Sequence, residues 1–243
     1  MNTFKPQDYI PQLSIDSVIF GYQEKELKVL VSQLNLQNQA IYTLSGGFIK
    51  QIESIDEAAG RILKDRTGLE NIYLEQFKTF GLINRTNKAV SELLEKEDHQ
   101  QSGGNQLKTS DIQWISNRFI SIGYYALVDI NKVALTKDNP QESAAWISVD
   151  NLPEMIMDHN EIVSEALNAL RNNLDEKLIG FNLLPETFTM RELKELYEAV
   201  YDRPFARNNF QKKMLSLNVL ERLEKQFTGA ANKAPYLYKF GKT

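Results

Sequence analysis

Residues 44–69 read LSGGFIKQIESIDEAAGRILKDRTGL, a pair of glycines followed by a short polar stretch and an alanine-rich segment. The apolar residues at the spacing of one helical face are Ile55, Ala58, Ala59 and Ile62. Ser54 with Glu57 three residues later is the capping-box pattern of a helix start, and Gly68 suits the left-handed residue that ends a helix. The stretch therefore predicts a tight turn at the glycine pair and then a helix that ends before Gly68.

The same stretch has the spacing of a known catalytic motif. Six residues match it: Gly47, Glu53, Arg61, Leu63, Gly68 and Leu69. The segment resembles the Nudix box, whose hydrolases cut nucleoside diphosphate derivatives with metals held by helix carboxylates. The three metal-binding glutamates of that pattern fall here on Ile62, Asp65 and Arg66. Because a hydrocarbon and a cation cannot bind Mg²⁺, we expect a Nudix-like frame without catalytic residues, a metal site or a cofactor, and therefore not an enzyme.

Strand patterns flank this motif on both sides. Residues 17–20 and 27–34 alternate apolar and polar side chains around the turn 21–26, which predicts a β-hairpin. Further strand patterns cover residues 74–83, 118–130 and 144–149. The polar stretch 87–116 lies between the first two of these, and its composition predicts a flexible insertion between neighbouring strands of one sheet.

The C-terminal third has a different organisation. Residues 158–177 predict a long amphipathic helix, and residues 188–201 predict a second helix that opens with a capping box. A polar, basic helix follows at 206–217, and residues 221–240 predict two strands around a turn that contains Gly and Lys. This order of helix, tight connection, helix and hairpin indicates a winged helix-turn-helix.

The charge of the chain is unevenly distributed. Residues 201–243 contain nine Lys and Arg residues and three acidic ones, a net charge of +6, whereas residues 1–200 contain 19 basic and 29 acidic residues, a net charge of −10. A basic C-terminal part on an acidic body is typical of a module that binds a polyanion such as DNA.

Two functional classes receive no support from the composition. The chain has no cysteine, which excludes disulfides, zinc–thiolate sites and cysteine nucleophiles. No apolar run reaches the roughly 18–20 residues of a membrane span, and the N-terminus lacks the pattern of a signal peptide. We therefore expect a cytoplasmic protein with no membrane partner.

A degenerate Nudix domain followed by a winged helix resembles the Nudix-related transcriptional regulators, and among them most closely the arabinose-responsive branch of Bacteroides. The segments that carry the likeness are SIDSVIFG (14–21), LSGGF (44–48), TGLENIYLEQ (67–76), SIGYYALV (121–128), IGFNLLPETFT (179–189), LYEAVY (196–201), NNF (208–210) and LYKF (237–240). The insertion at 87–116 departs from that family.

The resemblance implies the fold class and the domain limits. It implies an α+β chain with a Nudix-like α/β/α sandwich and mixed sheet over residues 1–157, a linker helix over 158–178 and a winged helix DNA-binding domain over 179–243.

The resemblance also implies a function: a ligand-responsive regulator, a homodimer that binds operator DNA and senses a small effector, either a sugar such as L-arabinose or an ADP-ribose-like nucleotide. The alternative is a divergent Nudix hydrolase whose C-terminal module is accessory. Metal-dependent turnover would identify the hydrolase, and salt-sensitive binding to duplex DNA would identify the regulator.

Candidate DNA contacts lie on the second helix of the winged module and on the hairpin. Arg207, Asn208, Asn209, Gln211 and Lys212 are the side chains expected to reach base edges or phosphates. Lys213, Lys225 and Lys233 are expected to contact phosphates, with Lys233 in the wing. The same residues are also compatible with an ordinary solvated helix face.

Candidate effector contacts are polar residues within apolar strands or at their ends: Asp16, Asn84, Arg85, Tyr124 and His159. Hydroxyl-bearing sugars are recognised by neutral and carboxylate hydrogen bonds with an aromatic face, whereas a diphosphate requires cations or a helix N-terminus. The loss of the metal-binding acids favours an uncharged effector. Each residue also has a structural explanation, since Asp16 can cap a turn, Tyr124 can belong to the core and His159 can start the long helix.

Overall fold

The computed structural model describes residues 4–36, 39–86, 92, 109–134, 142–176, 182–225 and 234–241. Its strands are β1 (Tyr9–Gln23), β2 (Glu26–Leu36), β3 (Gln39–Thr43), β4 (Ser45–Lys50), β5 (Tyr73–Phe80), β6 (Ile120–Val128), β7 (Glu142–Ser148), β8 (Phe188–Thr189), β9 (Leu220–Lys225) and β10 (Tyr236–Phe240). Its α-helices are α1 (Ile55–Thr67), α3 (Thr109–Ser116), α4 (His159–Glu176), α5 (Met190–Tyr201) and α6 (Arg207–Ser216), with short 3-10 helices at Pro6–Asp8, Ile130–Lys132 and Val149–Asn151.

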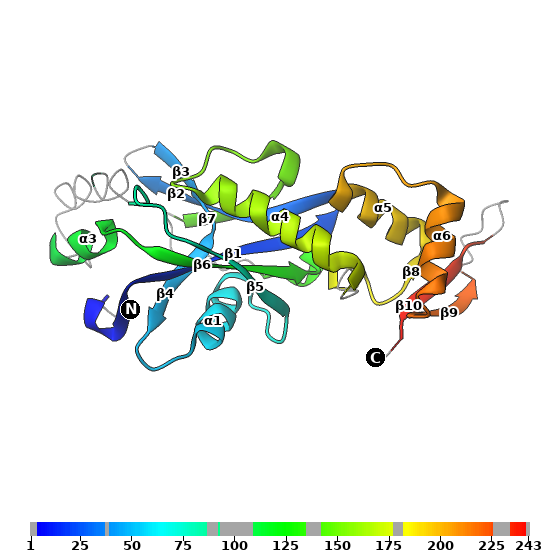
Figure 1. Cartoon of the computed structure of the whole chain (residues 1–243), viewed down its shortest axis with the longest axis horizontal. Helices are drawn as coiled ribbons and strands as arrows, with labels where there is room; N and C mark the ends of the chain where they lie inside the picture. Colours follow the sequence, from blue (N-terminus) through cyan, green and yellow to red (C-terminus); the bar gives the residue numbers. More distant parts are fainter. Residues whose placement is uncertain are drawn as a thin grey trace.

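The larger sheet is mixed and is organised around β1 (Figure 1). The strands run in the order β3-β2-β1-β6-β5, with β4 paired to β1 and β7 paired to β2. β1 and β6 are parallel, whereas the other pairs of this sheet are antiparallel. The hairpin expected from the alternation at 17–34 is confirmed as β1 and β2, and the pairing of β5 with β6 confirms that the insertion joins neighbouring strands.

The turn between β1 and β2 has an unusual backbone. Glu24 and Lys25 have φ angles of 56° and 66°, so both central residues of this two-residue turn are left-handed. Such turns match the twist of a hairpin and usually contain Asn or Gly, because other residues are strained there. The tip of the hairpin therefore has a defined shape that places Lys25 at its end.

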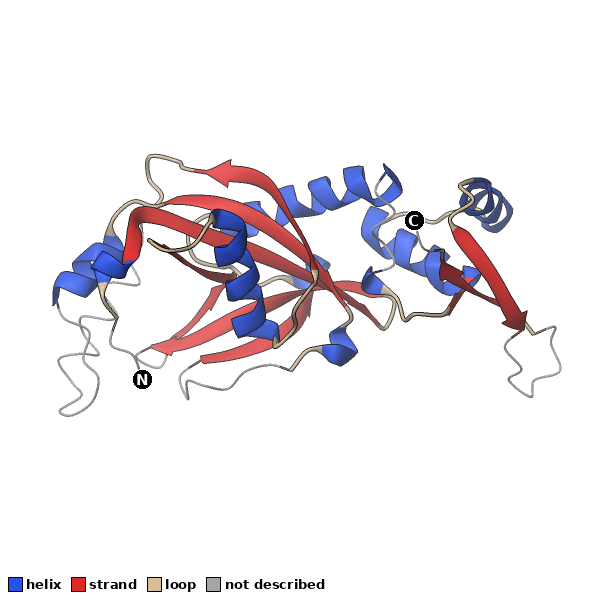
Figure 2. Cartoon of the chain, turned by 90° about the horizontal axis from the view of Figure 1, so that it is seen from below, coloured by secondary structure: helices blue, strands red, loops and turns tan. Residues whose placement is uncertain are grey.

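Helices cover both faces of the sheet, which confirms the α/β/α sandwich (Figure 2). On one face α1 packs Ala58, Ala59 and Ile62 against buried residues of β1, β4 and β6. On the other face α4 packs its buried side chains against β1 and β6. The residues that α4 buries are Ile162, Val163, Ala166, Leu170 and Leu174.

Helix α1 has the ends that its sequence predicts. The Ser54 hydroxyl accepts from the Glu57 amide, and the Glu57 carboxylate accepts from the Ser54 amide. Gly68 is left-handed, with φ 71°, and its amide donates to the Lys64 carbonyl. The capping box and the C-terminal glycine thus set the limits of this helix.

The expected tight turn at the glycine pair is wrong. Gly46 and Gly47 lie within β4, where they pair with Asp16 and Ile15 of β1. A Cβ at Gly46 would lie 2.8 Å from the Ile15 carbonyl oxygen and 2.8 Å from Asp16 Oδ1. The glycine is needed because β1 approaches β4 closely, and not because the chain turns there.

Substitution of Gly46 by alanine tests this explanation. We expect a loss of about 1–3 kcal/mol in the free energy of unfolding, because the added methyl group meets backbone that cannot move away. Gly60 provides the control, since a Cβ there meets nothing within 4 Å and Gly60→Ala within α1 should stabilise by about 0.5–1 kcal/mol. Urea unfolding of the two variants measures both values, and equal effects would contradict the close-approach explanation.

The insertion ends in a short helix that packs over β4. Within α3, Trp114 packs against Phe48 of β4 with ring centroids 4.8 Å apart, and against Phe119 with centroids 5.2 Å apart. Residues 87–91 and 93–108, on which the expectation of flexibility depends, lie outside the described residues.

The C-terminal part has the elements expected of a winged helix. Strands β8, β10 and β9 form a three-stranded sheet in that order, beside α5 and α6. Helix α5 starts with the capping box of Thr189 and Glu192. The loop between β9 and β10, with the expected wing residue Lys233, lies outside the described residues.

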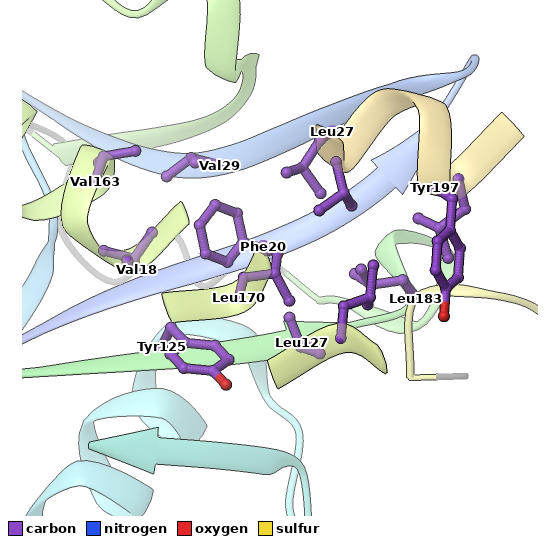
Figure 3. Packing of buried hydrophobic residues seen from close by; sticks show 14 of the residues in the cluster. Val18, Phe20, Leu27, Val29, Tyr125, Leu127, Val163, Leu170, Leu183 and Tyr197 are labelled. Atoms are coloured by element: carbon purple, nitrogen blue, oxygen red, sulfur yellow. The ribbon is translucent and has the colours of Figure 1, made fainter. Parts of the chain in front are cut away.

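One hydrophobic core joins the two parts of the chain (Figure 3). Phe20 and Leu27 of the large sheet belong to the same buried cluster as Tyr197 of α5, with Leu183 before β8 between them. The cluster continues through Leu193, Leu196, Val200, Phe210 and Met214. The winged module is therefore packed against the end of the β1–β2 hairpin and α4. Among the described helices, none is long and apolar enough to cross a membrane.

Candidate functional site

One arginine holds the connection between β4 and α1. Arg61 donates from Nε and Nη2 to the Glu53 carboxylate, at 2.9 and 2.6 Å, and from Nη2 to the Phe48 carbonyl at 2.9 Å. Glu53 also accepts from the Lys50 amide at 2.8 Å. The hydrogen bonds from Arg61 lower the pKa of Glu53, although partial burial acts in the opposite direction. These two motif residues therefore stabilise the segment that leads into the helix.

Of the three metal-ligand positions of the Nudix pattern, only the one at Asp65 keeps a carboxylate. Ile62 is 3% exposed and packs so closely on β4 that a Cβ at Gly47 would lie 3.0 Å from it. The Asp65 carboxylate is 63% exposed and lies 3.7 Å from the Arg61 guanidinium. In the parts of the chain that the structure describes, no three His, Asp or Glu residues are grouped as metal ligands. An apolar side chain thus occupies the first of the three positions.

A charged cluster is buried where β1, β6 and the start of α4 meet. Arg85 donates from Nη2 to Asp16 Oδ2 at 2.5 Å, and from Nε to the two Asp158 oxygens at 2.9 and 3.0 Å. Ser121 donates from Oγ to Asp16 Oδ2 at 2.6 Å. The Arg85 side chain is 2% exposed. One buried cation therefore joins the segment after β5 to β1 and α4.

His159 completes this cluster as a neutral side chain. Its Nδ1 accepts from the Leu44 amide at 3.0 Å, which leaves the proton on Nε2. Nε2 lies 3.7 Å from Asp16 Oδ1, beyond hydrogen-bond range, and makes no hydrogen bond within the described residues. Burial lowers the pKa of His159, while the charge of Asp16 acts in the opposite direction.

The structure brings three of the five expected effector residues together. Asp16, Arg85 and His159 form the buried cluster, and Asn84 is exposed beside it. Their arrangement is compatible with a binding site and equally with a structural pin, so effector binding by these residues stays a prediction.

Tyr124 lies on the opposite face of the sheet from that cluster. Asp16 is paired with Gly123, and the next residue along β6 points to the α1 side because strand side chains alternate. The Tyr124 hydroxyl donates to Asp56 Oδ1 at 2.6 Å, and burial is the main cause that raises its pKa. The five expected effector residues therefore do not converge on one site.

Two members of the cluster were not expected from the sequence. Asp158 is the first residue of the helix predicted over 158–177 and directly precedes the observed α4, a place where an acid is common for reasons of helix capping alone. Ser121 can be found only from the register of β1 with β6, which joins residues 105 positions apart. The signal for Asp158 was present but unspecific, and for Ser121 there was none.

Helix α6 presents a polar and basic surface. The exposed candidates on it are Arg207, Asn208, Asn209, Lys212 and Lys213, while Gln211 is half-buried. Arg207 and Gln211 line a pocket of about 770 Å³ beside the helix. Phe210 and Met214 anchor the opposite side of α6 in the core. The helix can therefore present these side chains to a macromolecular surface.

Three further cations of this domain, Arg191, Lys194 and Arg222, were not among the expected DNA contacts, whereas Lys225 was. Arg191 and Lys194 of α5 also line the pocket beside α6. On the hairpin, the Arg222 guanidinium lies 3.3 Å from the centre of the Tyr236 ring, and Lys225 Nζ lies 5.2 Å from it. The basic charge of the module thus gathers near α6 and β10.

Comparisons with known proteins agree with this geometry. Residues 180–240 match the family described as the NrtR DNA-binding winged helix domain. A relative from Acinetobacter baylyi, named ADPR responsive transcriptional repressor NtrR, is 23% identical over 98% of this chain and 85% of its own length. Neither that family nor that relative is described as arabinose-responsive, so the expected likeness to the Bacteroides branch finds no support.

Solved structures show the same fold over both domains. NrtR from Shewanella oneidensis, free and in complex with a 27mer DNA, is 21% identical with TM-scores of 0.69 and 0.70, over 95% of this chain and 94% of that one. A MutT/nudix family protein from Enterococcus faecalis is 17% identical with a TM-score of 0.67, over 96% of this chain and 89% of its own. The chain therefore has the fold of the NrtR-like, Nudix-related regulators, a Nudix-like domain followed by a winged helix domain.

Proposed function

We propose that the chain is a transcriptional repressor that binds operator DNA through α6 and responds to ADP-ribose or a closely related nucleotide. The observation that carries the proposal is the exposed row of Arg207, Asn208 and Lys212 on a helix whose other side is fixed in the core. Arginine, asparagine and lysine are the side chains that read base edges and phosphates in the major groove.

The effector is assigned from the relative's name and from one substitution in the Nudix-like frame. The Acinetobacter relative is named ADPR responsive. Arg66 places a positive charge where the hydrolase pattern has a glutamate, and an arginine is suited to bind a diphosphate without a metal. The loss of the metal-binding acids alone favours an uncharged sugar as the effector. With Arg66 and the relative's name taken into account, ADP-ribose is the proposed effector instead.

Hydrolysis of that nucleotide is not part of the proposal. Buried Ile62 occupies the first metal-ligand position of the Nudix pattern and Arg66 the third, where a cation repels Mg²⁺. Without converging carboxylates the site has no means to activate a water molecule. The frame can then bind a nucleotide and leave it intact.

Helix α4 is the proposed link between the two domains. Its first residue, His159, belongs to the buried charged cluster, and its 18 residues span about 27 Å. Near its other end Arg171 donates from Nε to the Val200 carbonyl at 2.7 Å and accepts on its own carbonyl from the Tyr201 hydroxyl at 2.8 Å. A shift of α4 on effector binding would therefore move the end of α5.

The regulator is further proposed to act in the cytoplasm as a homodimer. Helix-turn-helix dimers bind two half-sites about one helical turn apart, about 10 base pairs. An operator with two such half-sites is expected near the genes that the repressor controls.

Thermal unfolding with ADP-ribose in the presence of a metal chelator tests the effector. Saturating ligand, at about 100 times its Kd, is expected to stabilise the fold by about 2.7 kcal/mol, whereas L-arabinose should have no effect. Arg66→Gln should remove most of this shift. Lys64→Gln is the matched control, because it removes one positive charge from the exposed part of the same helix.

Binding and turnover assays distinguish the proposal from the alternative. Wild-type protein should bind duplex DNA from upstream of its own gene, more weakly at higher salt, and ADP-ribose should weaken that binding. Steady hydrolysis of ADP-ribose with Mg²⁺ or Mn²⁺, abolished by Asp65→Asn, would instead identify a hydrolase.

A further inference from the structure

A pocket in the winged helix domain lies between the start of α5, the recognition helix α6 and β10. Its volume is about 770 Å³. The lining residues are Thr189, Met190, Arg191, Lys194, Glu195, Arg207, Phe210, Gln211, Ala234, Pro235, Tyr236 and Tyr238. Three cations and one carboxylate thus face a hollow that adjoins the proposed DNA-binding surface.

The cations of α5 are neutralised to different degrees. Lys194 bonds to Glu198 at 2.6 Å within the same helix. Arg191 donates from Nε to Glu195 Oε1 at 2.8 Å, and its side chain is 75% exposed. Because Glu195 is the carboxylate to which Arg191 donates, and contributes more than Glu192 to the electrostatics of Arg191, the charge that Arg191 offers to a ligand depends on what else Glu195 binds.

Glu195 is shared between the two domains. The same Oε1 atom accepts from Arg191 and from Lys25 Nζ, at 2.8 and 3.2 Å. The Glu195 side chain is 17% exposed. Burial raises its pKa, but the hydrogen bonds from Arg191 and Lys25 outweigh this and leave the pKa below its ordinary value. Glu195 is therefore ionised at neutral pH and bound by two cations.

Lys25 belongs to the Nudix-like domain, so its position follows the β1–β2 hairpin of that domain. Lys25 lies at the left-handed tip of the β1–β2 hairpin, and Leu27, two residues along β2, belongs to the core cluster that contains Tyr197 of α5. Beside the tip, burial first and then the charges of Glu195 and its neighbours on α5 raise the pKa of Tyr22. A movement of the β1–β2 hairpin relative to α5 would thus change the Lys25–Glu195 contact directly.

We propose that the pocket holds a backbone phosphate of bound DNA and that Glu195 sets the charge of this phosphate site according to the position of Lys25. With Lys25 in contact, the Glu195 carboxylate is paired by Lys25 of the Nudix-like domain, and Arg191 can turn to the phosphate. With the hairpin displaced, Glu195 pairs with Arg191 alone and neutralises it. The inference rests on the proposed DNA-binding function and gives it a regulatory contact.

The substitution Glu195→Gln tests the inference in the full-length protein. It removes the negative charge that competes for Arg191. Binding is measured by fluorescence anisotropy with a labelled duplex of about 30 base pairs, about three helical turns, from upstream of the gene. The variant should bind the duplex more tightly than wild type at low salt, because it gains one cation–phosphate contact. This contact should steepen the slope of log K against log salt by about 0.9 per chain, so the ratio of the two affinities should change about threefold between 50 and 200 mM salt.

A second substitution separates this mechanism from a general charge effect. In an Arg191→Gln background the gain from Glu195→Gln should vanish, because Glu195 acts through Arg191. Glu186→Gln is the matched control, since it removes one exposed acid of the same domain that does not line the pocket. An equal gain from Glu186→Gln, or a gain that survives Arg191→Gln, would overturn the inference.

Lys25→Gln tests the second part of the inference, the contact between Lys25 and Glu195 across the two domains. It also keeps the inference testable if the Glu195 variant does not fold. Lys25 is 63% exposed, so its replacement should be tolerated, and DNA binding should weaken about threefold at low salt. Unchanged binding by this variant contradicts the coupling. If the wild-type protein binds no DNA at all, the proposed function itself fails. If the wild-type protein binds DNA and these substitutions leave binding unchanged, only the regulatory inference fails.

Discussion

Replacement of Arg85 by methionine is expected to lower the free energy of unfolding by about 3–5 kcal/mol. The Arg85 side chain is 2% exposed and is the cation that Asp16 and Asp158 share. Methionine fills a similar length but leaves two buried carboxylates without their positive partner. Charges that lose their partner in a low-dielectric interior are far more destabilising than the loss of an exposed ion pair.

Thermal and urea unfolding measure this loss. For a chain of this size 1 kcal/mol corresponds to about 2–4 °C, so the melting temperature should fall by about 10 °C. Arg118→Met is the matched control, because Arg118 is exposed and donates to the Gly81 and Leu82 carbonyls of the same loop. A similar small loss in both variants would show that the buried pairing contributes little.

Asp16→Asn in the Arg85→Met background separates charge from packing. The asparagine removes one of the two unpaired negative charges, so the double variant should be more stable than Arg85→Met alone. In the wild-type background the same substitution should destabilise. This change of sign is expected if the cluster is an electrostatic pin, whereas equal losses in both backgrounds would indicate that only shape matters.

The local features of the fold could be predicted because they depend on residues close in sequence. The capping boxes at Ser54 and Thr189 form as their spacing indicates. The role of Gly46 could not be predicted, because its reason is the approach of β1, about 30 residues earlier in the chain. A glycine pair in a strand and a glycine pair in a turn have the same sequence signature.

The candidate site could be predicted only in part for a related reason. Asp16, Arg85 and His159 are polar residues in apolar surroundings, and buried polar side chains usually contact one another because each needs a hydrogen-bond partner. Tyr124 carries the same signal, but the face of the sheet on which it lies depends on the register of two parallel strands. Contacts between domains, such as Lys25 with Glu195, leave no pattern in the sequence at all.

Loss of both Arg207 and Lys212 is expected to have the largest effect on DNA binding. If Arg207 reads a base edge its removal costs about 1–3 kcal/mol, and the loss of a lysine–phosphate contact lowers the salt slope by about 1. Arg207→Ala with Lys212→Ala should therefore weaken operator binding by about 100-fold near physiological salt. Both side chains are exposed on α6, so the fold should survive.

The control for this double variant must have the same net charge. Lys5→Ala with Lys132→Ala removes two exposed lysines from the Nudix-like domain and should leave operator binding within about twofold of wild type. Anisotropy with the upstream duplex and with a scrambled duplex then separates base reading from phosphate binding, because loss of Arg207 affects mainly the first. If the α6 variant still discriminates the two duplexes as the wild type does, α6 is not the recognition helix. Specificity would then have to come from another basic element such as the β9–β10 hairpin, where Arg222 and Lys225 lie against Tyr236.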